Sequence, residues 1–304
     1  MGKKDIYIDP SVHRKRENIE GLVDYHKGVP VFSLLEFNIY GACNRSCSFC
    51  PVSDVSFYKN TYKGIELSLY EKIKKELGDI SYSGNILYSA FSEPLLNKKV
   101  FELIKLTKKY LKSSKLEMVS NGDVLLKKPE MINRLFATGL DTLSISIYDG
   151  PAEYDKFKVM VSDSGLTKEQ VILRRRYEHN GNFGLTISNR AGLVDSNKYR
   201  ADGEEDIEIA SLPLKKSCYY PFYQMVIDYE GPVIMCAHDW KKEKIIGNAT
   251  EQNIFDIWQG NEMKKARLQL IKKSRNFLPC KNCDVKGDVM GGPNFEAWAK
   301  FYAK

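Results

Sequence analysis

The chain has 304 residues, of which 43% are hydrophobic and 28% charged, a composition typical of a globular protein with a sizeable core. No apolar run approaches the roughly 18 residues of a membrane span, and the first residues lack the apolar stretch of a signal peptide, so we expect a cytoplasmic location. The net charge of +7 is spread along the chain. This spread argues against a nucleic-acid partner, which usually requires a gathered basic patch.

Strands and helices are predicted to alternate after about 30 N-terminal residues of little periodicity. Two helix starts are marked by the spacing of capping boxes, Ser68 with Glu71 and Thr167 with Gln170. Three arginines, 174–176, fall in the second of these helices and are interpreted as a solvated face rather than a phosphate-binding patch. The predicted strands are 31–40, 85–90, 116–119, 142–148 and 183–188, and the predicted helices are 68–77, 98–111, 129–138 and 167–180.

This alternation indicates an α/β protein with parallel β/α units. About six strands are fewer than the eight of a closed barrel, so we predict a partial (β/α)₆ TIM-like barrel, with a doubly wound sheet as the alternative. Beyond the barrel, a β-hairpin around Gly231 and two short helices predict a small C-terminal α+β extension. The predicted units are an N-terminal extension at 1–33, the barrel at 34–195 and the extension at 196–304.

The seven cysteines form two groups. An odd number without a secretory signal argues against a disulfide framework and favours metal ligation. The first group is C-x-x-x-C-x-x-C, formed by Cys43, Cys47 and Cys50 on a loop directly after a predicted strand. Three thiolates on a four-iron cluster leave one iron open to a small molecule, whereas structural zinc requires four ligands. We therefore favour a [4Fe-4S] cluster over zinc at this loop.

The first cysteine loop resembles the signature of the radical S-adenosylmethionine (SAM) superfamily, including the aromatic Phe49 before its last cysteine. The resemblance implies that the open iron binds the amino and carboxylate groups of SAM, and that reduction of the cluster cleaves SAM to a 5′-deoxyadenosyl radical. Such radical chemistry belongs to the cofactor, and the protein supplies orientation and protection.

Polar residues after the later strands match the positions at which this family contacts SAM. Glu93 belongs to a segment that resembles the G-E-P-L-L form of the family's G-G-E motif, although Ser92 replaces its usual glycine. An S-N-G turn, two serines on the strand 142–148 and an arginine after the next strand complete the pattern; turn formation and pleat alternation are the alternative explanations. The resemblance thus implies cofactor contacts at Phe49, Ser92, Glu93, Ser120, Asn121, Ser144, Ser146 and Arg190.

The second group has the pattern C-x(12)-G-x(4)-C followed by C-x-x-C. Spacing alone leaves a Cys₄ zinc site and an iron–sulfur cluster equally open. The whole pattern resembles the auxiliary-cluster extension called SPASM, or its shorter form, twitch. The resemblance implies a second [4Fe-4S] cluster, fully ligated by Cys218, Cys236, Cys280 and Cys283.

Three ligands plus four use all seven cysteines, which leaves no thiol to return a hydrogen atom to a substrate radical. This favours a two-electron oxidation over the reaction of a cysteine-dependent radical epimerase. The resemblance implies two substrate classes: enzymes with one auxiliary cluster include one that oxidises a cyclitol alcohol, whereas many peptide maturases of the SPASM group carry a longer N-terminal recognition domain. We therefore expect a small polar substrate such as a sugar or cyclitol, with a ribosomal precursor peptide as the alternative.

Candidate substrate residues lie near the two cysteine groups. Tyr148 and Asp149 end a predicted strand, and His238 and Asp239 follow Cys236. A carboxylate or imidazole at these positions could accept the hydroxyl proton of an alcohol; the alternative is a satisfied turn or surface residue. The radical SAM resemblance also implies a reducing partner such as flavodoxin or ferredoxin, and nothing in the sequence indicates a membrane partner.

Overall fold

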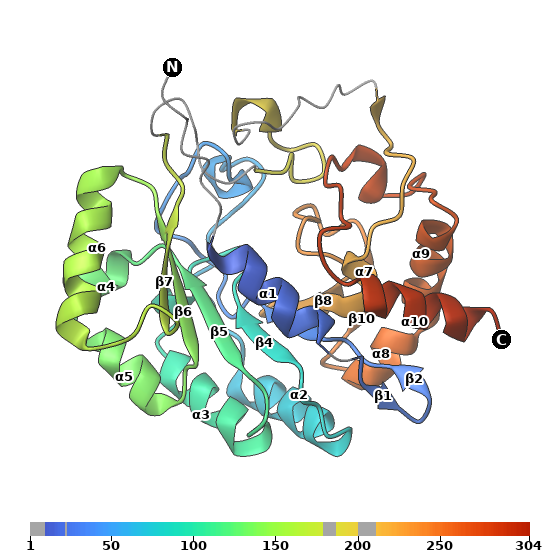
Figure 1. Cartoon of the computed structure of the whole chain (residues 1–304), viewed down its shortest axis with the longest axis horizontal. Coiled ribbons are helices and arrows are strands. Elements are labelled where there is room, and N and C mark those ends of the chain that lie inside the picture. Colours follow the sequence, from blue (N-terminus) through green and yellow to red (C-terminus); the bar gives the residue numbers. More distant parts are fainter. Residues whose placement is uncertain (1–9, 22, 179–186, 200–210) are drawn as a thin grey trace.

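The computed structural model describes residues 10–21, 23–178, 187–199 and 211–304. One sheet of eight strands runs through the molecule, with helices packed along its outer face (Figure 1). The strand order is β10-β9-β8-β3-β4-β5-β6-β7, and the strands from β8 to β7 are parallel, as expected for an open, partial barrel. The predicted α/β fold class is confirmed. The sheet strands are β3 (Leu34–Phe37), β4 (Asn85–Tyr88), β5 (Leu116–Ser120), β6 (Thr142–Ile147), β7 (Val171–Arg175), β8 (Gln224–Ile227), β9 (Pro232–Ile234) and β10 (Ile245–Asn248).

Side-chain alternation along the strands separates the two faces of the sheet. Leu35 and Phe37 point to the outer face, where they join the main hydrophobic core with the helices. One helix of this layer follows each of β3, β4 and β6, two follow β5, and short 3₁₀ turns lie between them. The helices and 3₁₀ turns of the barrel are η1 (Pro51–Ser53), α2 (Leu67–Asp79), η2 (Pro94–Leu96), α3 (Val100–Tyr110), α4 (Asp123–Lys127), α5 (Met131–Thr138), α6 (Pro151–Ser164) and η3 (Ser196–Tyr199).

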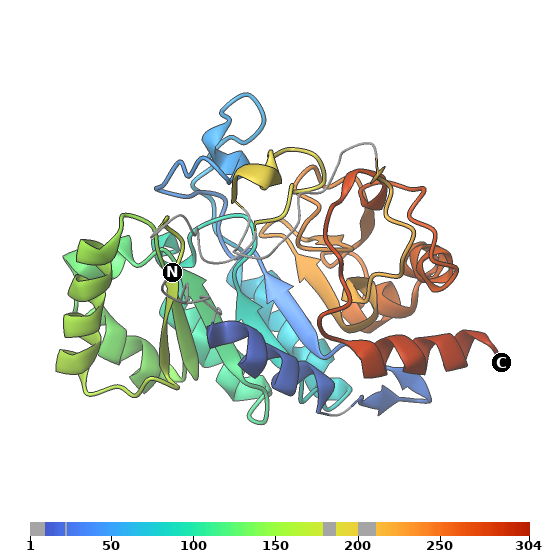
Figure 2. The same ribbon diagram turned by 45° about the horizontal axis from the view of Figure 1, so that its top comes forward.

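The segment predicted as an N-terminal extension contains α1 (Pro10–Glu20) and a two-stranded ribbon, β1 (Tyr25–His26) with β2 (Val29–Pro30). Figure 2 shows α1 across the face of the sheet opposite α2 and α3. Arg14 of α1 donates to Glu117 of β5 at 2.6 Å, and Ile19 is buried beside Leu34. The helix therefore covers the inner face of the open barrel with paired charges and apolar contacts.

The prediction of a helix that begins at Thr167 is wrong, because residues Val171–Arg175 form strand β7. The reciprocal bonds of the capping box do form, from Thr167 N to Gln170 Oε1 at 3.0 Å and from Gln170 N to Thr167 Oγ1 at 3.4 Å, but they close a turn. Pairing with the buried strand β6 outweighs the local signal. Arg174 and Arg176 are consequently buried, at 8% and 7% exposure, rather than forming a solvated helix face. The strand predicted at 183–188 lies mostly outside the described residues.

The capping box predicted at Ser68 is also wrong. Helix α2 begins at Leu67, and its N-cap Glu66 makes no side-chain cap. The carboxylate of Glu71 instead accepts hydrogen bonds from Tyr110 and Lys109 of α3, so the residue holds two helices together. Helices α4, α6 and α10 were not predicted.

The C-terminal part extends the same sheet. The predicted hairpin is confirmed as β8 and β9, with Gly231 at a positive φ of 111° in the turn, where a side chain would be strained.

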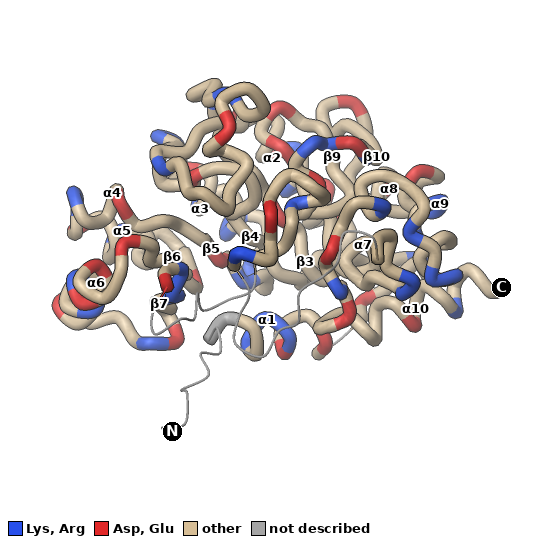
Figure 3. Tube along the Cα trace, turned by 90° about the horizontal axis from the view of Figure 1, so that it is seen from above, with Lys and Arg blue, Asp and Glu red and all other residues tan. Residues whose placement is uncertain are grey.

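Acidic and basic residues are interspersed along the trace rather than gathered in one region (Figure 3). Within the described residues no helix combines the length and apolar character required to cross a bilayer. The C-terminal helices are α7 (Tyr220–Tyr223), α8 (Ile254–Gln259), α9 (Asn261–Ile271), η5 (Cys280–Asn282) and α10 (Gly292–Tyr302).

Candidate functional site

The first cysteine loop follows β3 at the carboxyl edge of the sheet, where parallel β/α folds build their active sites. Asn60 holds its start, because its side chain accepts from Cys43 N at 3.0 Å and donates to Cys43 O at 3.1 Å. A backbone bond of 2.9 Å from Cys50 N to Cys47 O tightens its end. The three thiols are therefore presented on a short, partly exposed loop.

The three thiols influence one another electrostatically. Burial, the largest cause, and the negative charge of Cys50, a further one, raise the pKa of Cys43 to about 11 and that of Cys47 to about 12. Three mutually repelling thiolates suit a cationic iron centre among them. Thiolates around one zinc ion lie roughly 3.8 Å apart, because each Zn–S bond is about 2.3 Å. Among the described residues no three His, Cys, Asp or Glu side chains are arranged to chelate a single ion.

Arg45, inside the cysteine loop, joins the loop to the neighbouring strand ends. Its guanidinium donates to Asp123 at 2.5 and 2.8 Å, to Asp149 at 2.9 Å and to Glu153 at 2.7 Å. Burial opposes the charged form of Arg45, but these carboxylates outweigh it and raise the pKa of Arg45 above its usual value. The predicted substrate residue Asp149 is thereby held beside the cysteine loop, with its carboxylate 66% exposed. Arg45 was not predicted from the sequence, although its position between the two proposed cluster ligands Cys43 and Cys47 could have indicated it.

Two aromatic residues predicted separately lie together. The ring of Phe49 stacks on that of Tyr148, with centroids 5.8 Å apart. Burial raises the pKa of Tyr148 to about 12, and its side chain is hydrogen-bonded to Ser146. The guanidinium of Arg45 lies over the ring of Tyr148, 5.2 Å from its centroid. The aromatic residue of the cysteine motif is thus braced by the end of β6.

Glu93 lies at the centre of the predicted SAM-contact residues, after β4. Its carboxylate accepts from Ser120 Oγ at 2.8 Å, Asn121 N at 2.8 Å and Leu95 N at 3.0 Å. Burial raises the pKa of Glu93 to about 7 despite these three donors. The side chain of Asn121 also donates to Asn44 of the cysteine loop at 2.9 Å. The structure therefore brings Glu93, Ser120 and Asn121 together beside Cys43.

Ser144 is separated from this group. Its hydroxyl donates to Glu117 Oε1 at 2.9 Å and is completely buried in the barrel floor beneath α1. Ser146, one pleat repeat closer to the carboxyl edge, reaches Tyr148 instead. The two serines, assigned a common role from the sequence, thus have different surroundings.

Arg190 lies between the two cysteine groups. Its Nη1 contacts Ser188 Oγ at 3.3 Å, and its buried Nε has no hydrogen-bond partner among the residues that the structure describes. Ser188 also hydrogen-bonds His238 Nδ1 at 2.9 Å, and Arg190 acts electrostatically on Cys50. An orphaned guanidinium donor beside the first cysteine loop suits an anionic group such as the SAM carboxylate.

The second cysteine group is assembled from segments far apart in the sequence, and all four thiols are buried, with 7–9% exposure. Arg275 holds the segments around it: it donates to the carbonyls of Lys216 and Ser217 on one side and of Val285 and Lys286 on the other, at 2.6–3.0 Å. No sequence motif indicated this residue. Gly287 completes the enclosure, since a Cβ there would lie 2.4 Å from the sulfur of Cys218.

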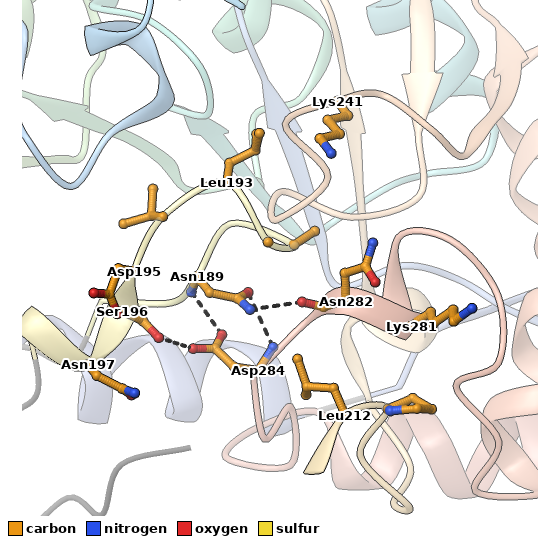
Figure 4. A pocket seen from close by; sticks show the side chains of 14 residues that line it. Asn189, Leu193, Asp195, Ser196, Asn197, Leu212, Lys241, Lys281, Asn282 and Asp284 are labelled. Carbon is orange, nitrogen blue, oxygen red and sulfur yellow. Dashed lines mark hydrogen bonds between the residues drawn. The ribbon is translucent and has the colours of Figure 1, made fainter. Parts of the chain in front are cut away.

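A cavity of about 500 Å³ lies beside Cys280–Asn282, between this segment and the residues after 187 (Figure 4). Asn189 lines this cavity. The side chain of Asn189 donates to Asn282 O at 2.8 Å, and its backbone N donates to Asp284 at 2.9 Å. Ser196 donates to the other oxygen of Asp284 at 2.6 Å. The end of the barrel is therefore tied directly to the C-x-x-C segment.

Asp239, predicted as a substrate residue, is completely buried. Its carboxylate accepts from the backbone N of Glu243 at 3.0 Å and of Lys244 at 2.8 Å, and so stabilises the turn that follows Cys236. Burial raises the pKa of Asp239 against these bonds. In this structure the residue has the surroundings of a satisfied turn residue, the alternative that the sequence left open.

Comparison with known proteins identifies both cysteine regions. The radical SAM superfamily matches residues 37–179, and the SPASM iron–sulfur cluster-binding domain matches residues 218–284. The S-adenosyl-L-methionine-dependent 2-deoxy-scyllo-inosamine dehydrogenase of Niallia circulans is 28% identical over 256 residues, covering 84% of this chain and 93% of that protein.

Solved structures agree with these matches. The crystal structure of BtrN in complex with AdoMet and 2-DOIA superimposes with a TM-score of 0.68 at 25% identity, over 84% of this chain and 94% of that one. Native anSMEcpe with bound AdoMet shares the fold at 14% identity, with a TM-score of 0.50 over 90% of this chain and 96% of that one. We conclude that the chain belongs to the radical SAM superfamily and carries a C-terminal SPASM iron–sulfur cluster-binding domain.

Proposed function

We propose that this radical SAM enzyme oxidises an alcohol carbon of a small polar metabolite, such as a sugar or cyclitol, to a ketone. The observation that carries the proposal is the distribution of the cysteines. Three lie on the partly exposed loop and four are enclosed, so none remains to return a hydrogen atom. The similarity to a dehydrogenase of an aminocyclitol supports the same reaction class.

Two cofactor sites follow from this proposal. Cys43, Cys47 and Cys50 hold a [4Fe-4S] cluster with an open iron, and the four buried cysteines hold a second, closed cluster. When bound, the first cluster supplies the electron that cleaves SAM to methionine and the 5′-deoxyadenosyl radical. Glu93 would accept a hydrogen bond from the SAM amino group, and Arg190, whose buried Nε has no partner among the described residues, would bind the SAM carboxylate.

The reaction balances as a two-electron oxidation. The substrate carbon gives up a hydrogen atom, which ends in 5′-deoxyadenosine, and then an electron, for which a second cluster held by Cys218, Cys236, Cys280 and Cys283 would be the acceptor. Its hydroxyl gives up a proton, and the C=O bond forms. A one-electron donor such as flavodoxin or ferredoxin supplies the electron for SAM cleavage. Among the predicted substrate residues, we assign the proton to the carboxylate of Asp149, because this side chain is 66% exposed beside the first cysteine loop. Tyr148 and His238 stay candidates for contact with the substrate.

Reconstitution of the iron centres tests the cofactor sites. We expect about eight irons per chain in the wild-type protein and about four in the Cys43→Ala/Cys47→Ala/Cys50→Ala variant. The variant should also release no 5′-deoxyadenosine. If it still cleaved SAM, the assignment of the catalytic cluster to this loop would be wrong.

The reaction class is tested separately, with SAM, a reductant and a panel of sugars and aminocyclitols that includes 2-deoxy-scyllo-inosamine. We expect one 5′-deoxyadenosine per ketone formed in deuterated water, and no alcohol product that carries deuterium at the reacting carbon. Deuterium in a product that is still an alcohol would identify an epimerase instead.

A further inference from the structure

A chain of hydrogen bonds connects the second cysteine group to the predicted SAM-contact segment. Lys242 Nζ donates to Asp228 Oδ2 at 2.5 Å, and Asp228 Oδ1 accepts from Asn38 Nδ2 at 2.7 Å. Asn38 Oδ1 in turn accepts from Ser92 Oγ at 2.5 Å. The middle of this series of hydrogen bonds is buried, since Asn38 and Asp228 are only 1% and 2% exposed. The residues come from three parts of the sequence, around 38, around 92 and from 228 to 242.

Each bond of this chain has a determined direction. The carboxylate of Asp228 can only accept hydrogen bonds, so the NH₂ group of Asn38 must face it. The amide oxygen of Asn38 then faces Ser92, whose hydroxyl has to donate. A flipped amide would place two oxygens against each other in a buried site, which is unfavourable. The ion pair with Lys242 therefore orders the chain as far as Ser92.

Sheet register explains why the central pair meets. Strands β3 and β8 are parallel neighbours in which Phe37 is paired with Ile227, so the next residues along, Asn38 and Asp228, emerge side by side. A backbone bond of 2.9 Å from Asn38 N to Ile227 O continues the ladder. The two strands lead to the first and second cysteine regions respectively.

The position of Lys242 depends on the turn that begins at Cys236. Lys242 has a positive φ of 54°, and its backbone N donates to Asp239 O at 3.1 Å. A left-handed conformation at a lysine persists only where its surroundings impose it. Trp240 of the same turn packs edge-on against Phe91, with ring centroids 4.9 Å apart. The turn therefore contacts the Phe91–Ser92 segment through both a ring and a hydrogen-bonded chain.

We propose that Lys242, Asp228 and Asn38 are positioning residues that hold the SAM-binding segment 92–93 in place, and that they make SAM binding depend on the turn after Cys236. This inference rests on the proposed function of Glu93. Ser92 is the last residue of this series of hydrogen bonds. It occupies the position where the family usually has glycine, which has no side chain to donate a hydrogen bond to Asn38. The coupling is thus a property of this chain's own sequence.

The test compares Lys242→Met with Lys63→Met. Lys63 forms an exposed pair of 3.7 Å with Glu230 on the same hairpin and serves as the matched control. In anaerobically reconstituted protein we expect Lys242→Met to weaken SAM binding about tenfold, equivalent to about 1.4 kcal/mol, without loss of iron. Lys63→Met should bind like the wild type, and Lys242→Arg should recover most of the affinity. In a Ser92→Gly background Lys242→Met should have no further effect.

A second measurement needs no SAM. In the reconstituted protein without SAM, Lys242→Met should speed hydrogen exchange in the peptide that covers 89–97 and leave helix α8 unchanged. An unchanged or uniformly raised exchange rate, or an equal loss of SAM affinity in the Ser92→Gly background, would overturn the inference. If the reconstituted wild-type protein did not bind SAM, the proposed function itself would be contradicted.

Discussion

The two cysteine regions differ in how the chain builds them. The first places three thiols on one loop, 43–50, and leaves them partly exposed. The second gathers four thiols from segments up to 65 residues apart, Cys218 to Cys283, and buries all of them. A local, open group suits a centre that must bind and release a small molecule, whereas an enclosed group suits a centre with no vacant position.

The supporting arginines differ in the same way. Arg45 holds the first region through the carboxylates of Asp123, Asp149 and Glu153. Arg275 holds the second through four backbone carbonyls. The first region therefore depends on side-chain charges that can be changed singly, while the second depends on the course of the backbone. This difference predicts unequal responses to mutation.

The largest expected effect is on the stability of the second region. Replacing Cys283 by Ala should remove its cluster and lower the free energy of unfolding by several kcal/mol, because metal-centre binding contributes directly to folding when the ligands are brought together only in the folded state. Replacing Cys47 by Ala should cost much less, since its loop is local. Anaerobic urea unfolding of the reconstituted proteins measures both. Equal losses would show that the first region is as deeply integrated into the fold as the second.

A smaller effect is expected at Arg45. Replacing it with Met leaves Glu153, only 7% exposed, without its cation, and should cost about 2 kcal/mol of stability. SAM cleavage should fall more than iron content, because the loop retains its thiols but loses its connection to β6. Adding Glu153→Gln should restore part of the stability.

The matched control for this prediction is Arg16→Met. Arg16 pairs with Glu20 on the exposed side of α1 at 2.9 Å, and such i,i+4 pairs contribute only about 0.3–0.5 kcal/mol. If Arg16→Met and Arg45→Met had the same effect on unfolding, the carboxylates around Arg45 would not support the first region.

Much of this comparison could be predicted from the sequence, because local spacing encodes it. The three-cysteine loop, the hairpin around Gly231 and most barrel strands follow from short patterns. The tertiary parts could not be predicted. Arg275 acts on the carbonyls of distant residues, and no spacing rule connects it to Cys218. The polar residues of α1 lack clear periodicity and predicted only an N-terminal extension, although Arg14 pairs with Glu117 inside the barrel.

The wrong helix at Thr167 teaches the same lesson. Its capping bonds form as the sequence indicates, yet the following residues become a strand because β6 offers a buried edge to pair with. Local signals identify a turn reliably, but what continues from it is decided by the surface it meets.

The smallest effect concerns the seam between the two regions, where Gln224 of β8 donates to Glu36 of β3. Burial raises the pKa of Glu36 above 4.5 despite the opposing charge of Lys15. A carboxyl with a raised folded pKa destabilises the protein progressively as the pH rises above 4.5. Glu36→Gln should therefore be more stable than the wild type at pH 7, with the advantage disappearing as the pH falls below 4.5. Each unit of pKa shift corresponds to about 1.4 kcal/mol.

Glu117, on the same inner face, provides the opposite case. Burial favours a higher pKa, but Lys15 and Arg14 outweigh it and lower the pKa of Glu117 below 4.5. Its contribution to stability is present above pH 4.5 and is lost as the pH falls through the folded pKa, so Glu117→Gln should be less stable at pH 7 and approach the wild type in acid. Urea unfolding of the metal-free variants from pH 7 to pH 3 measures both slopes. Slopes of the same sign would mean that α1 does not distinguish the two carboxylates, and that the barrel floor under the first region is held by apolar contacts alone.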